Sequence, residues 1–174
     1  MRFVSAALVA TCLSLGACDA SPEPAQLSVD LQATGVKNLA MPRPGLLTAG
    51  QPTEAQLEQL ARLGVKRVIC LRPEDEPDTG WEEAKAEALG IDFVRLPVPG
   101  APAVSVANAH RLGEEIAAAH GATTMVCCAS SNRVGALLAL HAFHDEKMPA
   151  PEALALGKAA GLKSLEPQVQ ALLK

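Results

Sequence analysis

Aromatic side chains are scarce in this chain: its 174 residues include no tyrosine, one tryptophan and three phenylalanines. Nearly half of the residues are nevertheless hydrophobic, so leucine, valine and alanine must fill the core. Proteins that bind single-stranded nucleic acids stack aromatic side chains on the bases, and those that bind duplexes present a basic surface. This chain has few aromatics and a formal net charge of −4. Both features argue against nucleic acid as a partner.

The chain also has no apolar run of the length that an ordinary transmembrane helix needs. Residues 3–15 are apolar and free of charge, but they are too few to span a bilayer. They follow Arg2 and lead into Leu15-Gly16-Ala17-Cys18, which resembles the bacterial lipobox, where the cysteine is lipidated and becomes the mature N-terminus. An ordinary secretory peptide cleaved near Ala20 is the alternative.

We therefore predict a lipoprotein signal peptide over residues 1–18, lipidation of Cys18, a polar tether over residues 19–35 and one domain over residues 36–174. The protein would then lie in the cell envelope, anchored to a membrane by its lipid and facing the periplasm. The sequence does not decide between the inner and the outer membrane.

Three cysteines remain for the domain once Cys12 and Cys18 are assigned to the leader and to the lipid, namely Cys70, Cys127 and Cys128. An odd number of thiols cannot all pair, so at least one should be free in an oxidising compartment. A free thiol outside the cytoplasm is a candidate for chemistry. Cys70 is interpreted either as a core residue or as a resolving thiol for one of the other two.

Strand and helix patterns alternate through the domain. Strands are predicted over residues 46–49, 65–71, 91–98 and 123–127. Helices are predicted behind two capping boxes, Thr53 with Gln56 and Thr79 with Glu82, then from Ser105, from Asn132 or Arg133, from Pro151 and from Leu165. This alternation predicts an α/β fold: a small, mostly parallel sheet with helices on both faces. Ligands of such sheets bind beyond the carboxyl ends of the strands, where Cys127 and Cys128 lie.

The junction after the last predicted strand reads Cys128-Ala129-Ser130-Ser131-Asn132-Arg133. A helix that begins there would aim its unpaired N–H groups at the end of the strand. Arg133 could add a planar fork of donors that suits an oxyanion. Such surroundings favour the thiolate form of a cysteine and would hold a phosphate, sulfate or thiosulfate group beside it. A buried structural cysteine followed by an ordinary turn is the simpler reading.

Three segments in this order resemble a bacterial phosphatase-like family associated with beta-lactamase hydrolase-like proteins: residues 46–52, residues 64–73 and residues 126–137. That family has the fold of dual-specificity protein tyrosine phosphatases, and some members are labelled sulfur transferases. The resemblance extends over about residues 38–173. It implies a nucleophile at Cys128 and an oxyanion-binding arginine at Arg133. Ala129, Ser130, Ser131 and Asn132 would complete the substrate-binding loop, and Arg72 would brace the loop, bind substrate or cap its own turn.

The chain departs from the family pattern at three points. Cys127 stands where the family has a histidine that helps to order the loop, and Ser131 replaces a loop glycine. A positive φ at Ser131 would cost on the order of 1 kcal/mol. The spacing from Cys128 to Arg133 is also one residue shorter than in protein tyrosine phosphatases and matches rhodaneses, although counting from Cys127 restores the longer spacing. The family pattern favours Cys128 as the nucleophile.

A phosphatase also needs an acid to protonate the leaving oxygen, and the proline-rich loop over residues 97–102 contains none. Asp75 and Asp78, which follow the strand that ends near Cys70, are the nearest substitutes, unless they simply form a solvated turn. The first functional hypothesis is a cysteine-dependent phosphatase-like hydrolase acting on phosphate esters. A sulfurtransferase that carries a persulfide on Cys128 and an inactive anion-binding module are the alternatives. No metal site and no cofactor are expected.

Overall fold

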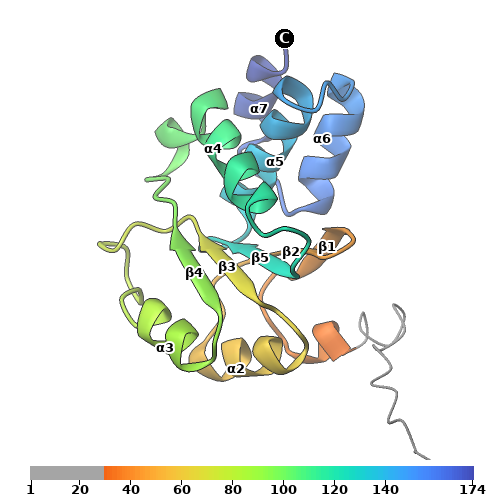
Figure 1. Cartoon of the computed structure of the whole chain (residues 1–174). Coiled ribbons are helices and arrows are strands. Elements are labelled where there is room, and N and C mark those ends of the chain that lie inside the picture. Colours follow the sequence, from red (N-terminus) through yellow and green to blue (C-terminus); the bar gives the residue numbers. More distant parts are fainter. Residues whose placement is uncertain (1–29) are drawn as a thin grey trace, which may run out of the picture.

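The computed structural model describes residues 30–174, which form a five-stranded sheet between two layers of helices (Figure 1). The strands lie in the order β1-β2-β5-β3-β4. Only β1 runs antiparallel to its neighbour, and all other pairs are parallel. The strands are β1 (Ala40–Arg43), β2 (Leu46–Ala49), β3 (Arg67–Cys70), β4 (Asp92–Arg95) and β5 (Thr124–Cys127).

Helices cover both faces of the sheet, as the alternating pattern predicts. Two of them, α2 (Glu54–Arg62) and α3 (Glu82–Ala88), lie on one face. The other face carries α4 (Val106–Ala117), α5 (Asn132–His144), α6 (Ala150–Ala159) and α7 (Glu166–Leu172), with the short 3-10 helix η1 (Ala101–Ala103) before α4. Each face buries its own aliphatic core, and aromatic side chains are nearly absent from both. The predicted fold class is confirmed.

The capping signals hold for two helices and fail for one. Thr53 and Gln56 form the reciprocal capping box at the start of α2, and the Ser105 hydroxyl accepts from Asn108 N at the start of α4. The box predicted from Thr79 and Glu82 is wrong, because α3 begins later, after Trp81. The Thr79 hydroxyl instead donates to backbone carbonyls of its own turn. Glu82 is only 2% exposed and points into the protein.

The packed part of the chain starts before the predicted boundary at residue 36. Residues 30–33 are helical, and Leu31 is buried in the core on the α2 side of the sheet. The predicted signal peptide, Cys18 and the first part of the tether lie outside the described residues. Within residues 30–174, every helix is too short or too polar to cross a membrane.

Strand β5 is central and fully buried, as its nearly continuous apolar residues predict. It pairs with β2 on one side and with β3 on the other. In these parallel ladders, Cys127 is level with Ala49 and with Cys70, so three strands end at the same edge of the sheet. The loop that begins at Cys128 therefore lies where this topology places ligands.

Candidate active site

The two neighbouring cysteines face opposite sides of the sheet, because successive side chains of a strand alternate. Cys127 belongs to the core beneath α2 and α3, together with Cys70. Cys128 belongs to the core beneath α4 to α7, the side from which Arg133 emerges at the start of α5. Cys128 is anchored by its backbone N–H, which donates to Ala49 O at 3.2 Å. The residue is only 1% exposed.

Arg133 lies beside the Cys128 sulfur and is held by three acceptor atoms from two other residues. Its Nη1 donates to Glu76 Oε1 at 2.5 Å and to Val98 O at 2.8 Å, and its Nη2 donates to Glu76 Oε2 at 2.9 Å. Burial of the guanidinium acts to lower the pKa of Arg133, but the hydrogen bond to Glu76 and the charge and contact of Cys128 raise it overall. The guanidinium is thus a permanent cation next to this sulfur.

Three of the five N–H donors of Arg133 are used by Glu76 and by Val98 O. The two that remain are Nε–H and one hydrogen of Nη2, which lie side by side along one edge of the planar group. No oxygen of residues 30–174 accepts from this edge. A side-by-side pair of donors matches two oxygens of a phosphate or a carboxylate. One edge of Arg133 is therefore not paired with oxygen, and its two donors can bind an oxyanion in a bidentate manner beside the Cys128 sulfur.

Glu76 is the acidic residue that the sequence did not single out. Its carboxylate also accepts from Arg72 Nε at 2.9 Å, so it joins two arginines. The Arg133 guanidinium, with help from Arg72, holds the pKa of Glu76 below its ordinary value, although partial burial acts in the opposite direction. Glu76 is consequently ionised at neutral pH and serves as an acceptor rather than as an acid. The Arg72-x-x-x-Glu76 spacing is the only sequence signal for it, and that spacing is common.

Arg72 both caps its own turn and borders the site. Its guanidinium donates to Glu76 and to the carbonyl of Pro77, and its own carbonyl accepts from Arg95 Nη1 at 3.0 Å. These contacts fix the loop that carries Glu76 against the end of β3. Arg72 therefore contacts Arg133 only through Glu76.

Ser131 adopts the left-handed conformation that the family glycine would have taken, with φ of +66°. Its hydroxyl is buried and donates to Ala160 O at 2.8 Å, which offsets part of the strain. Gly161 makes room for this side chain, since a Cβ at position 161 would lie 2.6 Å from Ser131 Cβ. The serine side chain is therefore bound to the end of α6.

The other loop residues divide between support and lining. The Asn132 side chain binds the α6–α7 connection, donating to Ser164 Oγ at 2.7 Å and accepting from Lys163 N at 2.7 Å. Ser130 O accepts from Asn38 Nδ2 at 2.9 Å. The side chains of Ser131 and Asn132 are therefore structural, and only their backbone remains available for the predicted substrate contact. Ala129 is exposed and lines a pocket.

This pocket has a volume of about 710 Å³ and opens beside the loop. Ala129 and Arg72 line it on the side of the loop. The other lining residues come from the start of α2 and from the segments that precede β1, α2 and α3: Lys37, Gln51, Pro52, Thr53, Glu54, Ala55, Asp78 and Trp81, the only tryptophan of the chain. Of the two predicted acids, Asp78 lines the pocket, whereas Asp75 is exposed and does not.

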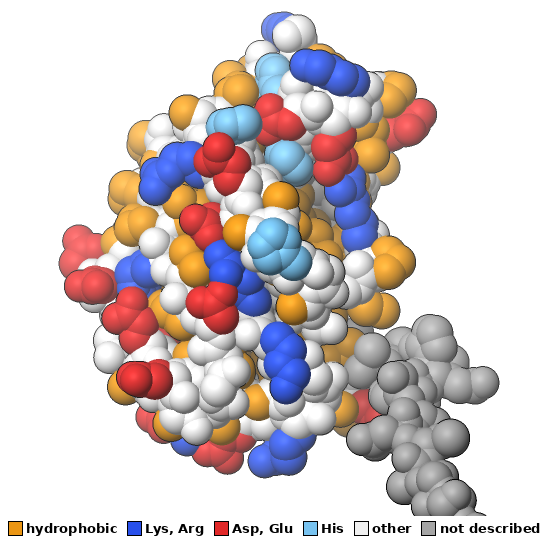
Figure 2. All heavy atoms as spheres, viewed as in Figure 1, with side chains coloured by type: hydrophobic (Ala, Val, Ile, Leu, Met, Phe, Trp, Pro, Cys, Tyr) orange, Lys and Arg blue, Asp and Glu red, His pale blue; other side chains and the backbone are white. Residues whose placement is uncertain are grey.

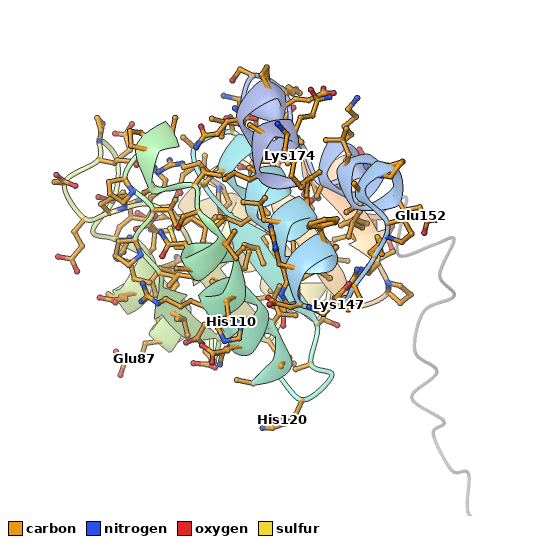
Figure 3. The ribbon with its side chains drawn as sticks, turned by 90° about the horizontal axis from the view of Figure 1, so that it is seen from above. Glu87, His110, His120, Lys147, Glu152 and Lys174 are labelled. Carbon is orange, nitrogen blue, oxygen red and sulfur yellow. The ribbon has the colours of Figure 1, made fainter. Side chains whose placement is uncertain are left out.

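The histidines lie away from this site. His110 is exposed and contacts Glu114 and Asp145 at the surface, and Figure 3 shows His120 at the outer edge of the molecule. His141 pairs with Asp145, and His144 Nε2 lies 2.9 Å from Leu172 O. In residues 30–174, no group of histidine, cysteine and carboxylate side chains is arranged to hold a metal ion.

Acidic and basic side chains are interspersed on the face seen in Figure 2.

Comparison with known proteins agrees with this geometry. Residues 29–164 match the model of a family described as "DSP-PTPase phosphatase fused to NAD+ Kinase". The chain belongs to this family. A beta-lactamase hydrolase-like protein of Xylella fastidiosa (strain Temecula1 / ATCC 700964) is 32% identical over 120 residues. The match covers 67% of this chain but only 27% of that protein, so the chain spans about a quarter of the length of this relative.

Solved structures show the same fold. A candidate phosphatase of Shewanella putrefaciens CN-32 is 26% identical, with a TM-score of 0.67 over 83% of this chain and 93% of its own. P. aeruginosa TpbA in complex with pTyr is 19% identical, with a TM-score of 0.63 over 81% of this chain and 85% of its own. The family membership and these likenesses identify a phosphatase-like α/β domain of the dual-specificity protein tyrosine phosphatase type.

Proposed function

We propose that this protein is a cysteine-dependent phosphatase that hydrolyses phosphate esters through a thiol-phosphate intermediate on Cys128. The observation that carries the proposal is the contact of the Cys128 sulfur with an Arg133 guanidinium that has one edge not paired with any oxygen of residues 30–174. Glu76 and Val98 O fix the opposite side of that guanidinium. The site therefore presents a nucleophile and an oriented oxyanion clamp before substrate arrives.

In the proposed reaction, the Cys128 thiolate attacks phosphorus, a sulfur–phosphorus bond forms and the ester oxygen leaves with a proton. Arg133 and the N–H groups at the start of α5 bind the phosphate oxygens as their charge redistributes. Water then hydrolyses the sulfur–phosphorus bond and releases phosphate and the free thiol. Because Cys128 is 1% exposed, the substrate must approach through the pocket beside Ala129 and displace side chains from above the sulfur.

Asp78 is the better placed of the two predicted general acids, since it lines the pocket and Asp75 does not. Loss of a general acid slows catalysis by about 10²–10⁴ when the leaving group is poor. We therefore propose that Asp78→Asn reduces hydrolysis of alkyl phosphates much more than that of aryl phosphates, whose leaving groups need little protonation. An equal loss on both substrates would remove Asp78 from this role.

The envelope location is also a proposal, supported by the lipobox-like sequence that ends at Cys18. Mass spectrometry of the mature N-terminus should find lipid on Cys18. An unmodified N-terminus at residue 19 or beyond would contradict it.

The proposed activity is tested with p-nitrophenyl phosphate under reducing conditions. Wild type should hydrolyse it, Cys128→Ser should not, and the adjacent control Cys127→Ser should retain most of the rate because Cys127 faces the other core. Loss of activity in Cys127→Ser with retention in Cys128→Ser would overturn the assignment. Sulfur transfer from thiosulfate to cyanide without phosphatase activity would support the rhodanese-like alternative instead. Vanadate binding without either activity would indicate an inactive module.

A further inference from the structure

Cys70 and Cys127 form a pair that the proposed phosphatase reaction does not use. They are the last residues of β3 and β5 and are direct partners across the parallel ladder. Neighbouring strands are about 4.8 Å apart, which lies within the range of Cα separations, roughly 4.4–6.8 Å, that a disulfide can bridge. Both side chains belong to the core beneath α2 and α3, so the two sulfurs face the same side of the sheet.

The two thiols also lie in a polar niche within that core. Cys70 Sγ donates to Glu82 Oε1 at 3.7 Å and accepts from Arg95 Nη1 at 3.8 Å. Glu82 and Arg95 form a buried ion pair at 2.8 Å, with side chains 3% and 8% exposed. Gln51, which lines the pocket beside the loop, donates to the same carboxylate at 2.7 Å. Gln51, which forms part of the pocket wall, is thus two contacts away from the Cys70 sulfur.

The contact between the thiols makes them unequal. The hydrogen bond from Cys127 lowers the pKa of Cys70, in spite of its burial. The same contact, together with burial, raises the pKa of Cys127 well above its ordinary value. Cys70 is therefore the thiol that ionises first, while Cys127 keeps its proton. The thiolate is the form of a cysteine that reacts with a peroxide, so Cys70 is the thiol that is oxidised first and Cys127 is the one that reacts with it afterwards.

We propose that Cys70 and Cys127 are a redox pair, which a hydroperoxide converts to a disulfide while Cys128 stays free. The geometry gives each of the three thiols of the domain a place. Cys70 and Cys127 are partners across the ladder, and Cys128 lies on the opposite face of the sheet. This pairing does not depend on phosphatase activity.

The reaction with hydrogen peroxide balances in two steps. Cys70 passes its proton to the neighbouring Glu82 carboxylate, and the thiolate attacks one peroxide oxygen, so that a sulfur–oxygen bond forms and the oxygen–oxygen bond breaks. The departing hydroxide takes the proton back and leaves as water. Cys127 then attacks the sulfenic sulfur of Cys70, forming the disulfide and releasing a second water. Two thiols lose two electrons, and one peroxide gains them.

The disulfide would join the ends of the two strands from which the site loops emerge. Leu71 N already donates to Cys127 O at 2.8 Å, and Arg95 binds the carbonyl of Arg72. A covalent link between positions 70 and 127 would tie the Arg72–Glu76 loop to the Cys128 loop. It should also raise the resistance of the domain to urea, because a cross-link restricts the unfolded chain.

The pair is tested by treating the full chain with hydrogen peroxide and mapping disulfides in tryptic peptides without reduction. Residues 68–85 and residues 112–133 should appear as one linked species, since Arg72 precedes a proline and resists cleavage. Cys127 and Cys128 share the second peptide, so variants identify the partner. The link should persist in Cys128→Ser and vanish in Cys127→Ser, and the wild-type urea midpoint should rise on oxidation.

Other products would overturn the inference. These are a link that persists in Cys127→Ser, a bond between Cys127 and Cys128 within one peptide, or oxidation of Cys70 to its sulfinic acid without any link. The wild-type map shows by itself whether Cys70 is linked to the second peptide, and fragmentation between Cys127 and Cys128 identifies the partner, so a misfolded variant cannot decide the result alone. Phosphatase assays of the reduced protein are independent, and failure of the proposed activity would leave the disulfide map intact.

Discussion

Glu76 offers the sharpest test of how the site is held together. Its carboxylate bridges Arg133 and Arg72, and the side chains are 25%, 11% and 7% exposed. The substitution Glu76→Gln keeps the shape and one acceptor oxygen but removes the charge. It leaves two buried guanidinium groups without their shared anion.

The expected cost follows from the partial burial of this bridge. Removing one partner of a fully buried ion pair costs about 3–5 kcal/mol, whereas an exposed pair contributes about 0–1 kcal/mol. A quarter of the Glu76 side chain is exposed, and glutamine retains one hydrogen bond. We expect Glu76→Gln to lower the free energy of unfolding by about 1–3 kcal/mol at pH 7.

The same substitution predicts a pH dependence. The pKa of Glu76 is lowered in the folded protein by the hydrogen bond from Arg133. A lowered carboxyl pKa stabilises the fold above the unfolded pKa, near 4.3, and this contribution is lost as the pH falls through the folded pKa. The difference in stability between wild type and Glu76→Gln should therefore be full at pH 7 and should shrink below about pH 4.

Urea unfolding at several pH values measures this difference, with Asp75→Asn as the matched control. Asp75 is the adjacent exposed acid, so its substitution removes the same charge without touching Arg133 and should change stability by less than about 0.5 kcal/mol. The reasoning would be refuted if both variants behaved alike, or if the Glu76→Gln difference did not vary with pH.

Three further predictions concern the packing around the site. Ser131→Ala keeps the strained backbone and removes the hydrogen bond to Ala160 O, so urea unfolding should show that the free energy of unfolding falls by about 1–2 kcal/mol. Ser131→Gly loses the same hydrogen bond but relieves the strain, so its free energy of unfolding should stay within about 1 kcal/mol of wild type. Gly161→Ala should lower the melting temperature and reduce the free energy of unfolding by about 2 kcal/mol or more, because φ is +101° and the added Cβ would meet the Ser131 side chain. A variant as stable as wild type would refute this contact. Glu82→Gln removes the buried partner of Arg95 and leaves it only the exposed Glu74, 3.9 Å away, so it should cost about 3 kcal/mol in urea; a cost below about 1 kcal/mol would contradict burial of the pair.

Much of the fold follows from local signals in the sequence. The central position of β5 follows from its unbroken apolar residues, and the starts of α2 and α4 follow from their caps. The capping signal failed at Thr79, because the buried ion pair with Arg95 draws Glu82 into the core and leaves it unavailable as a capping residue. A tertiary contact of this kind has no local signature in the sequence.

The sequence indicates that Cys128 and Arg133 lie close together, but it does not indicate which residues orient Arg133. The adjacency of Cys128 and Arg133 follows from a six-residue loop at the end of a strand. Glu76 lies 57 positions away along the chain from Arg133, and only the packing of two loops brings them together. The alternation of a strand also separates Cys127 from Cys128, a distinction that loop spacing alone left open.

Acid-quench trapping of the phosphorylated enzyme tests the central claim most directly. Wild type that turns over an aryl phosphate labelled in its phosphate group should carry the label on the peptide of residues 112–133, and Cys127→Ser should carry it too. Cys128→Ser should carry none. Label that persists in Cys128→Ser, or turnover by that variant, would contradict an oxyanion site built on the Cys128 sulfur and Arg133.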